Sequence, residues 1–211
     1  MAAMSNLTDQ YRCPMGPDGR TVAKLMNREH KQLTLWGLSK IKIGTDCVIL
    51  DVGCGGGKTV SRLANLAPQG KVYGIDYSPD MAEYSKKVNK KLIAQNRVEI
   101  VAGSVLQMGF RDGFFDLVTA VETYYFWSSF SDALKEIKRV LKPGGRLLLV
   151  NEMIKDGKYE VANAKLIEET HVQLIPLEEI QNALRKIGFA DIEVYTKDSS
   201  AWNAVIAQKQ M

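Results

Sequence analysis

The sequence predicts a single α/β domain of the doubly wound kind, and three observations support this prediction. The chain has 211 residues, of which 45% are hydrophobic, so it can bury one sizeable core but hardly two. Short β-branched runs alternate with longer stretches of helical periodicity between residues 47 and 152. These runs are continuously apolar, which indicates a parallel sheet covered by helices on both faces.

The first 40 residues are expected to form a lid over this domain. Residues 1–20 are polar and rich in proline and glycine, which is typical of a turn-rich arm. Between Thr21 and Lys40 the apolar residues recur at helical spacing, which predicts one amphipathic helix. We therefore divide the chain into an N-terminal arm and helix, 1–40, and a main domain, 41–211.

Strands and helices alternate in order along the main domain. The predicted strands are 47–52, 71–76, 97–103, 114–121 and 145–152, and helical patterns occupy 58–67, 79–95 and 131–142. A mostly helical stretch then leads to Gly188. Two further strands, 190–197 and 200–209, are joined by a turn that is too short for a parallel crossover. The sequence thus predicts a mixed sheet of seven strands whose last strand is antiparallel.

Composition narrows the class of protein further. The net charge of +4 comes from dispersed Lys and Arg residues, so nucleic acid is not favoured as a partner. Cys13, Cys47 and Cys54 lack the paired short spacings of a zinc site, and we expect free thiols and no metal. We find no secretory signal and no apolar segment of ~18 residues. A cytoplasmic protein without a membrane partner is expected.

The segment ILDVGCGGGKTV, residues 49–60, is compatible at first sight with three kinds of ligand-binding loop. A phosphate-binding P-loop is rejected because Val52 stands where that motif requires a glycine. The dinucleotide fingerprint G-x-G-x-x-G has Lys58 at its third glycine position, so an NAD(P)-dependent oxidoreductase is the weaker alternative. The pattern D-x-G-x-G-x-G is complete. Its carboxylate and close backbone approach suit a cationic ligand.

This third pattern resembles the first motif of the class I S-adenosylmethionine (SAM) dependent methyltransferases. Asp76 ends the second strand, where a doubly wound fold places an acid for the ribose hydroxyls. The segments FFDLVTAVE (114–122) and LKEIKRVLKPGGRLLLVNE (134–152) are similar to later motifs of the same family. One departure is Ser104, which stands where most relatives carry an aspartate for the adenine amino group.

The resemblance, which is to small-molecule (type 11-like) members, implies SAM as the methyl donor and S-adenosylhomocysteine as the product. It also implies a set of cofactor-binding residues at the ends of the first four strands. These residues are Asp51, Gly53, Cys54, Gly55, Gly57, Asp76, Tyr77, Met81, Gly103, Ser104, Val105 and Val121.

Methyl transfer from a sulfonium is an in-line displacement, so the protein mainly has to align the acceptor with the methyl group. A general base is needed only for an acceptor that is protonated at neutral pH. The catalytic candidates are His30, Glu122 and Tyr124, and the candidate substrate contacts are Tyr11, Arg12, Tyr125, Trp127 and Glu152.

We expect a small-molecule acceptor because no large insertion separates the strands. Methylation of RNA or protein stays open as an alternative, as does a SAM-binding domain without catalysis. The acceptor molecule, its reacting atom and the oligomeric state are left open by the sequence.

Overall fold

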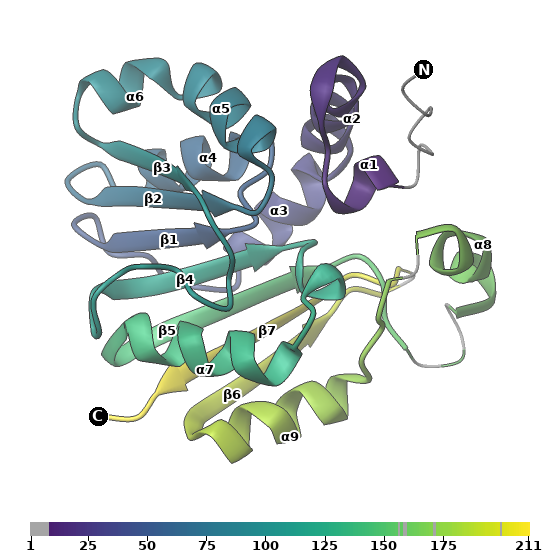
Figure 1. Ribbon diagram of the computed structural model, residues 1–211. Helices are drawn as coiled ribbons and strands as arrows, with labels where there is room; N and C mark the ends of the chain where they lie inside the picture. The colour runs from purple at the N-terminus through teal and green to yellow at the C-terminus, as the bar shows by residue number, and fades with distance from the viewer. Residues whose placement is uncertain (1–8, 156, 158–159, 171, 199) are drawn as a thin grey trace.

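The computed structural model describes residues 9–155, 157, 160–170, 172–198 and 200–211. These residues contain one seven-stranded sheet of order β3-β2-β1-β4-β5-β7-β6 (Figure 1). Strand β7 pairs antiparallel with both of its neighbours, and all other pairs are parallel. The predicted fold class is therefore confirmed. The strands are β1 (Val48–Val52), β2 (Lys71–Asp76), β3 (Val98–Ala102), β4 (Phe115–Val121), β5 (Leu141–Asn151), β6 (Phe189–Thr196) and β7 (Asn203–Lys209).

Helices cover both faces of the sheet (Figure 1). On one face, α7 and α9 pack on Leu147 and Leu149 of β5; on the other, α3, α4 and α5 share a core with Leu148 and Val150. This alternation follows from the two-residue period of a strand, which turns neighbouring side chains to opposite faces. The helices of the main domain are α4 (Lys58–Leu66), α5 (Pro79–Val88), α6 (Lys90–Ala94), α7 (Phe130–Val140), α8 (Glu160–Thr170), α9 (Leu177–Ile187) and the 3-10 helix η1 (Tyr124–Phe126).

The N-terminal segment is helical, but its helices differ from the single one predicted over 21–40. The structure has α1 (Asp9–Arg12), α2 (Gly16–Glu29) and α3 (Lys31–Leu38), with a break at His30. Helix α2 begins earlier because Pro17 fits the first turn, where its missing N–H costs nothing. Apolar residues continue at helical spacing on both sides of His30, so the pattern does not predict the break.

Two hydrogen bonds attach this segment to the start of α5. The Gly16 amide donates to Asp80 Oδ2 at 2.6 Å, and Ser78 Oγ donates to the Pro14 carbonyl at 2.6 Å. Ser78 also caps α5 by accepting from the Met81 amide at 3.3 Å. The start of α2 thus lies beside the carboxyl end of β2.

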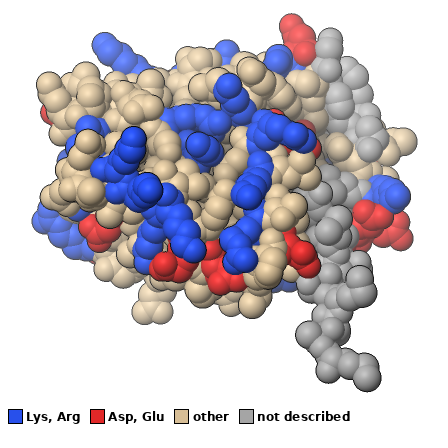
Figure 2. Space-filling model, turned by 90° about the horizontal axis from the view of Figure 1, so that it is seen from above, with Lys and Arg blue, Asp and Glu red and all other residues tan. Residues whose placement is uncertain are grey.

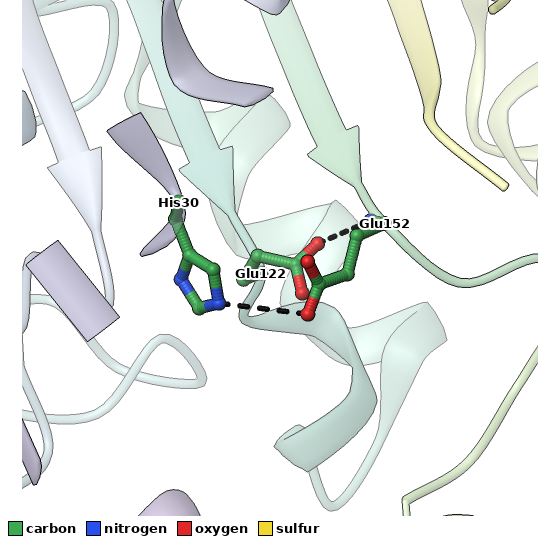
Figure 3. Close-up of side chains that lie close together, drawn as sticks. All are labelled: His30, Glu122 and Glu152. Atoms are coloured by element: carbon green, nitrogen blue, oxygen red, sulfur yellow. Dashed lines mark hydrogen bonds and ion pairs between the residues drawn. The ribbon is translucent and has the colours of Figure 1, made fainter. Parts of the chain in front are cut away.

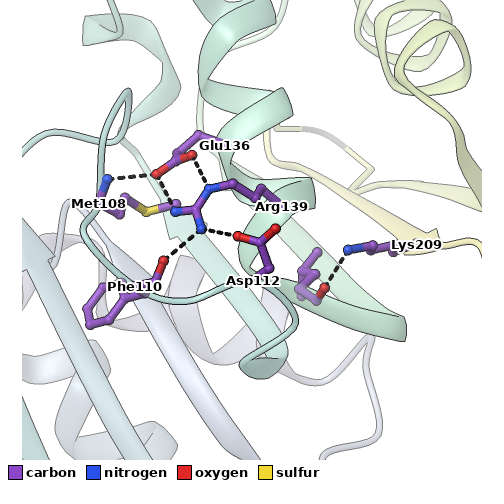
Figure 4. Close-up of polar contacts among 7 residues, drawn as sticks. Met108, Phe110, Asp112, Glu136, Arg139 and Lys209 are labelled. Atoms are coloured by element: carbon purple, nitrogen blue, oxygen red, sulfur yellow. Dashed lines mark hydrogen bonds and ion pairs between the residues drawn. The ribbon is translucent and has the colours of Figure 1, made fainter.

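The loop between β3 and β4 is held by one arginine of α7 (Figure 4). Arg139 pairs with Glu136 and Asp112 and donates to the Phe110 carbonyl at 2.7 Å. Glu136 Oε1 accepts from the Met108 amide at 2.8 Å. The network therefore contacts the loop at Met108 as well as at Phe110 and Asp112. The pKa of Glu136 is lowered, mainly by its hydrogen bond with Arg139. This network holds residues 108–112, which follow the cavity-lining residues 103–106, against α7.

Lys and Arg side chains spread over much of the face formed by α2, α5 and α6 (Figure 2). Exposed members include Lys87, Lys90 and Lys91. Across the described residues, we find no helix with the length and apolar character needed to cross a membrane.

Candidate active site

The order of the strands places a binding site at one edge of the sheet. Strands β2 and β3 lie on one side of β1, and β4 and β5 lie on the other. In open α/β sheets, ligands bind outside the carboxyl ends of the strands at this reversal. A cavity of roughly 310 Å³ lies there, between α2 and the loops that follow β1, β2, β3 and β4. Its volume is at the lower end of the range for small-ligand pockets, about 300–1,000 Å³.

The glycine loop after β1 forms the floor of this cavity. Gly53, Gly55 and Gly57 all have positive φ, at 68°, 47° and 75°. A Cβ on Gly53 would lie 2.4 Å from Thr123 Cγ2, so only glycine permits this approach. A Cβ on Gly55 would meet nothing closer than 3.9 Å, because this glycine borders open space. The loop therefore offers bare backbone to a ligand.

Asp76 connects the glycine loop to the start of α5. Its Oδ2 accepts from the Gly55 amide at 2.7 Å, and its Oδ1 accepts from the Ser78 amide at 2.9 Å. Burial raises the pKa of Asp76, whereas these backbone hydrogen bonds oppose the rise. Asp76 lines the cavity, as do Tyr77 and Met81.

Asp51 has a different environment. Its side chain is buried, it is not among the cavity-lining residues, and its Oδ1 accepts from Thr119 Oγ1 at 2.7 Å. Burial raises its pKa to about 7. Gly57 also lies behind the wall, where a Cβ would approach Ser85 Oγ at 2.3 Å. The other predicted cofactor residues do line the cavity, namely Gly53, Cys54, Gly55, Asp76, Tyr77, Met81, Gly103, Ser104, Val105 and Val121.

Another part of the cavity wall is formed by His30, Glu122, Phe126 and Trp127. Tyr124 and Tyr125 are both buried in the layer behind it, with ring centroids 4.3 Å apart. The Tyr125 hydroxyl donates to Glu122 Oε1 at 3.3 Å and accepts from the Met153 amide at 3.2 Å. Burial raises the pKa of both tyrosines. They support the wall and do not line it.

Of the predicted contacts from the N-terminal arm, Arg12 lines the cavity, and the side chain of Tyr11 lies outside the described parts of the chain. Helix α2 adds Met26 and Asn27, which sequence reasoning missed as site residues. Asn27 Nδ2 donates to the Gly56 carbonyl at 3.2 Å, which joins α2 to the glycine loop. Met26 and Asn27 precede His30 by four and three residues, so all three share one face of a helix. This spacing is the sequence signal that could have identified them as site residues.

His30, Glu122 and Glu152 point toward one another from three separate segments, namely the break between α2 and α3, the end of β4 and the end of β5 (Figure 3). His30 Nε2 lies 3.5 Å from Glu152 Oε1, and one ligand-type atom from each of the three residues lies within 4.8 Å of the others. Glu122 has a positive φ of 60° and accepts a hydrogen bond from the Glu152 amide. We call this set the His-Glu-Glu cluster. The sequence predicted its members separately and did not predict their meeting.

The two carboxyl groups of this cluster differ in their tendency to ionise. Burial raises the pKa of Glu122 well above its ordinary value, and the neighbouring Glu152 carboxylate adds to the rise. Burial also acts on Glu152, but His30 outweighs it and keeps the pKa of Glu152 below its ordinary value. The pKa of Glu152 is therefore the lower of the two.

The fold and this cavity define a doubly wound α/β protein with a small-ligand site at the strand-order reversal. Residues 50–149 match a family model described as "Methyltransferase domain". This match confirms the resemblance to the class I SAM-dependent methyltransferases over the glycine loop and nearly all of the first five strands.

Individual relatives agree with the family match. The chain is 26% identical over 176 residues to the sterol 4-C-methyltransferase strm-1 of Caenorhabditis elegans, covering 81% of this chain and 51% of the relative. It is 36% identical over 124 residues to the demethylmenaquinone methyltransferase of Lactococcus lactis, covering 57% of this chain and 49% of the relative. The chain thus spans about half the length of these curated relatives.

A solved structure shows the same fold. Phosphoethanolamine N-methyltransferase 2 of Haemonchus contortus, solved in complex with S-adenosyl-L-methionine, superposes with a TM-score of 0.75 at 20% identity. The superposition covers 86% of this chain and 53% of that one.

Proposed function

We propose that this chain binds SAM in the cavity and transfers its sulfonium methyl group to a small-molecule acceptor. The observation that carries the proposal is the glycine loop with positive φ angles, joined by hydrogen bonds to Asp76 at the strand-order reversal. The family match over residues 50–149 supports it. S-adenosylhomocysteine is then the second product.

The cavity suits such a donor in two respects. The bare Gly55 backbone leaves room that a Cβ would fill. Thr123 Oγ1 is buried and has no hydrogen-bond partner among the described residues, although Thr123 lines the cavity. An unpaired buried hydroxyl costs free energy, so a polar ligand that reaches it gains by the contact.

We assign the donor-binding roles by position. Each carboxylate oxygen of Asp76 carries one protein hydrogen bond and can accept another, so both can receive a ribose hydroxyl. The Ser104 hydroxyl is the counterpart of the usual adenine-binding aspartate and binds more weakly than a carboxylate. Asp51 lies behind the glycine loop and does not line the cavity. The positive charge of a donor bound nearby favours the ionised form of Asp51.

The acceptor occupies the end of the cavity bounded by His30, Glu122, Phe126 and Trp127. Aromatic rings beside the reacting groups exclude water and favour a positively charged sulfonium by their faces. Tyr124 acts by packing against Tyr125, which in turn orients Glu122. Alignment of acceptor, methyl and sulfur supplies about 7–11 kcal/mol of the barrier reduction, so no single residue has to carry the reaction.

A small acceptor is favoured by the relatives of the chain. The curated relatives described above are named for a sterol and for demethylmenaquinone, which are small molecules. The experiment is incubation of the chain with methyl-labelled SAM and fractionated cell extract. Label in a low-molecular-weight product supports the proposal, and label recovered only in RNA or protein contradicts the acceptor class.

A further inference from the structure

We propose that the His-Glu-Glu cluster is a binding site for one divalent first-row metal ion. His30 supplies an imidazole nitrogen, and Glu122 and Glu152 supply carboxylate oxygens. This donor set suits Mn²⁺, Fe²⁺ or Zn²⁺, since imidazole and carboxylate are both common ligands of these ions.

The first argument is geometric. Ligand atoms bonded to one such ion at about 2.1 Å are roughly 3.0 Å apart when adjacent and at most about 4.2 Å apart when opposite. His30 Nε2 and Glu152 Oε1 are 3.5 Å apart, and all three atoms lie within 4.8 Å of one another. Small side-chain rotations therefore suffice to bring all three onto one ion.

The second argument is charge. Glu122 is only 7% exposed, and its carboxyl group lies next to that of Glu152. Among the described residues, Glu152 forms an ion pair with His30, and neither carboxylate pairs with a lysine or arginine. Two carboxyl groups this close together either share a proton or bind a cation, because two ionised carboxylates repel each other. A divalent cation would allow both to ionise, the buried Glu122 and Glu152, whose side chain is 37% exposed.

The third argument is that the ligands are already held in place. The Tyr125 hydroxyl and the Glu152 amide both donate to Glu122 Oε1, which fixes the orientation of that carboxyl group. Outer hydrogen bonds of this kind orient metal ligands in known sites. His30 and Glu122 line the cavity, whereas Glu152 does not, so an ion held by the three residues would border the space assigned to the acceptor. There a metal-bound hydroxyl or carboxylate oxygen of an acceptor would be positioned and polarised.

The test measures metal binding without SAM, so its outcome does not depend on the proposed methyl transfer. The chain is freed of metal by chelator and dialysis and then titrated with MnCl₂, with free Mn²⁺ followed by electron paramagnetic resonance. The test variants are His30→Ala and Glu152→Gln, with Glu122→Gln as a third. Glu83→Gln, an exposed carboxylate on α5 that pairs with Lys86, is the matched control.

We expect one saturable Mn²⁺ site per chain, weakened about tenfold or more in each cluster variant and unchanged in Glu83→Gln. Thermal unfolding of each metal-free variant confirms that it is folded, and His30→Ala with Glu152→Gln decides the matter if Glu122→Gln does not fold. Absence of a saturable site for Mn²⁺, and for ZnCl₂ in a parallel titration, would overturn the proposal in favour of a proton shared by the carboxyl groups. A site that persists in both variants would overturn it too, because the ion would then be bound elsewhere. SAM binding by the same samples, measured calorimetrically, tests the proposed function separately.

Discussion

Asp51 and Asp76 end adjacent strands of the sheet and yet differ in their surroundings. Asp76 lines the cavity and receives two backbone N–H groups, whereas Asp51 is held behind the glycine loop by Thr119. The sequence places both acids at the same edge because each lies near the carboxyl end of a parallel strand. It does not distinguish their roles, since the register of β1 against β4 decides which side chain meets Thr119.

Replacing Asp76 with asparagine should weaken SAM binding. The amide has one acceptor oxygen in place of two, so a backbone N–H or a ribose hydroxyl loses its partner. Hydrogen bonds to a charged group contribute about 1.5–3 kcal/mol, which corresponds to roughly a 10- to 150-fold loss of affinity. Isothermal titration calorimetry measures this loss, with Glu83→Gln as the control. An unchanged dissociation constant for Asp76→Asn would remove Asp76 from the donor site.

Asp51 should make stability depend on pH in the absence of ligand. Burial raises its folded-state pKa to about 7 from an ordinary value of 3.8. Between these values the folded chain keeps a proton that the unfolded chain has released, so the free energy of unfolding falls as the pH rises through this window. The slope is at most about 1.4 kcal/mol per pH unit.

Asp51→Asn cannot ionise and so lacks this contribution. Relative to the unsubstituted chain, the variant should become more stable by about 1–3 kcal/mol between about pH 5 and about pH 8. Urea unfolding at both pH values gives the difference, and the contribution of Asp76 cancels because both chains retain it. A constant difference across this range would contradict a raised pKa at Asp51.

At the scale of the elements, α3 lies unusually close to β5. Gly37 is the point of contact, since a Cβ there would lie 2.4 Å from Val150 Cγ2 and 2.7 Å from Val150 Cγ1. Gly37→Ala should therefore destabilise the fold by about 1–3 kcal/mol through overpacking, although alanine favours the helix itself. Urea unfolding measures the loss.

Val150→Ala provides the control for this contact. In that background the two methyl groups are gone and only the Val150 Cβ position, 3.1 Å from the new Cβ, remains, so Gly37→Ala should cost clearly less. If Gly37→Ala costs the same in both backgrounds, the close approach of α3 and β5 is not the cause. The glycine in the predicted N-terminal helix gave no sequence signal of this contact, because it depends on which strand the helix covers.

The elements themselves were largely predictable, and their junctions were not. The seven strands follow from β-branched runs and the antiparallel last pair from a short turn, and both agree with the structure. The break at His30 did not follow, because apolar residues continue at helical spacing across it. That break matters for the site, since it is where His30 meets Glu152.

At the scale of the whole molecule, proximity in the site depends on strand order. Glu122 and Glu152 each follow a strand, and β4 and β5 are neighbours in the sheet. The sequence predicts each position at the carboxyl edge but does not fix which strands are adjacent. The cofactor half of the site was recognisable because it starts from one local motif, residues 51–57, and continues at the ends of the strands that follow in the sequence. The acceptor half combines three distant segments, so its members were found singly.

The response of the whole fold to ligands should separate the proposed function from its rival. A ligand that binds only the folded chain raises the free energy of unfolding by about 2.7 kcal/mol at one hundred times its dissociation constant. For a chain of this size, each kcal/mol raises Tm by about 2–4 °C. Saturating SAM or S-adenosylhomocysteine should therefore raise Tm by about 5–11 °C in differential scanning fluorimetry. NAD should leave Tm unchanged because Lys58 replaces the third glycine of a dinucleotide loop. Asp76→Asn serves as the control, with a smaller shift for SAM, and a shift with NAD alone would instead favour an oxidoreductase.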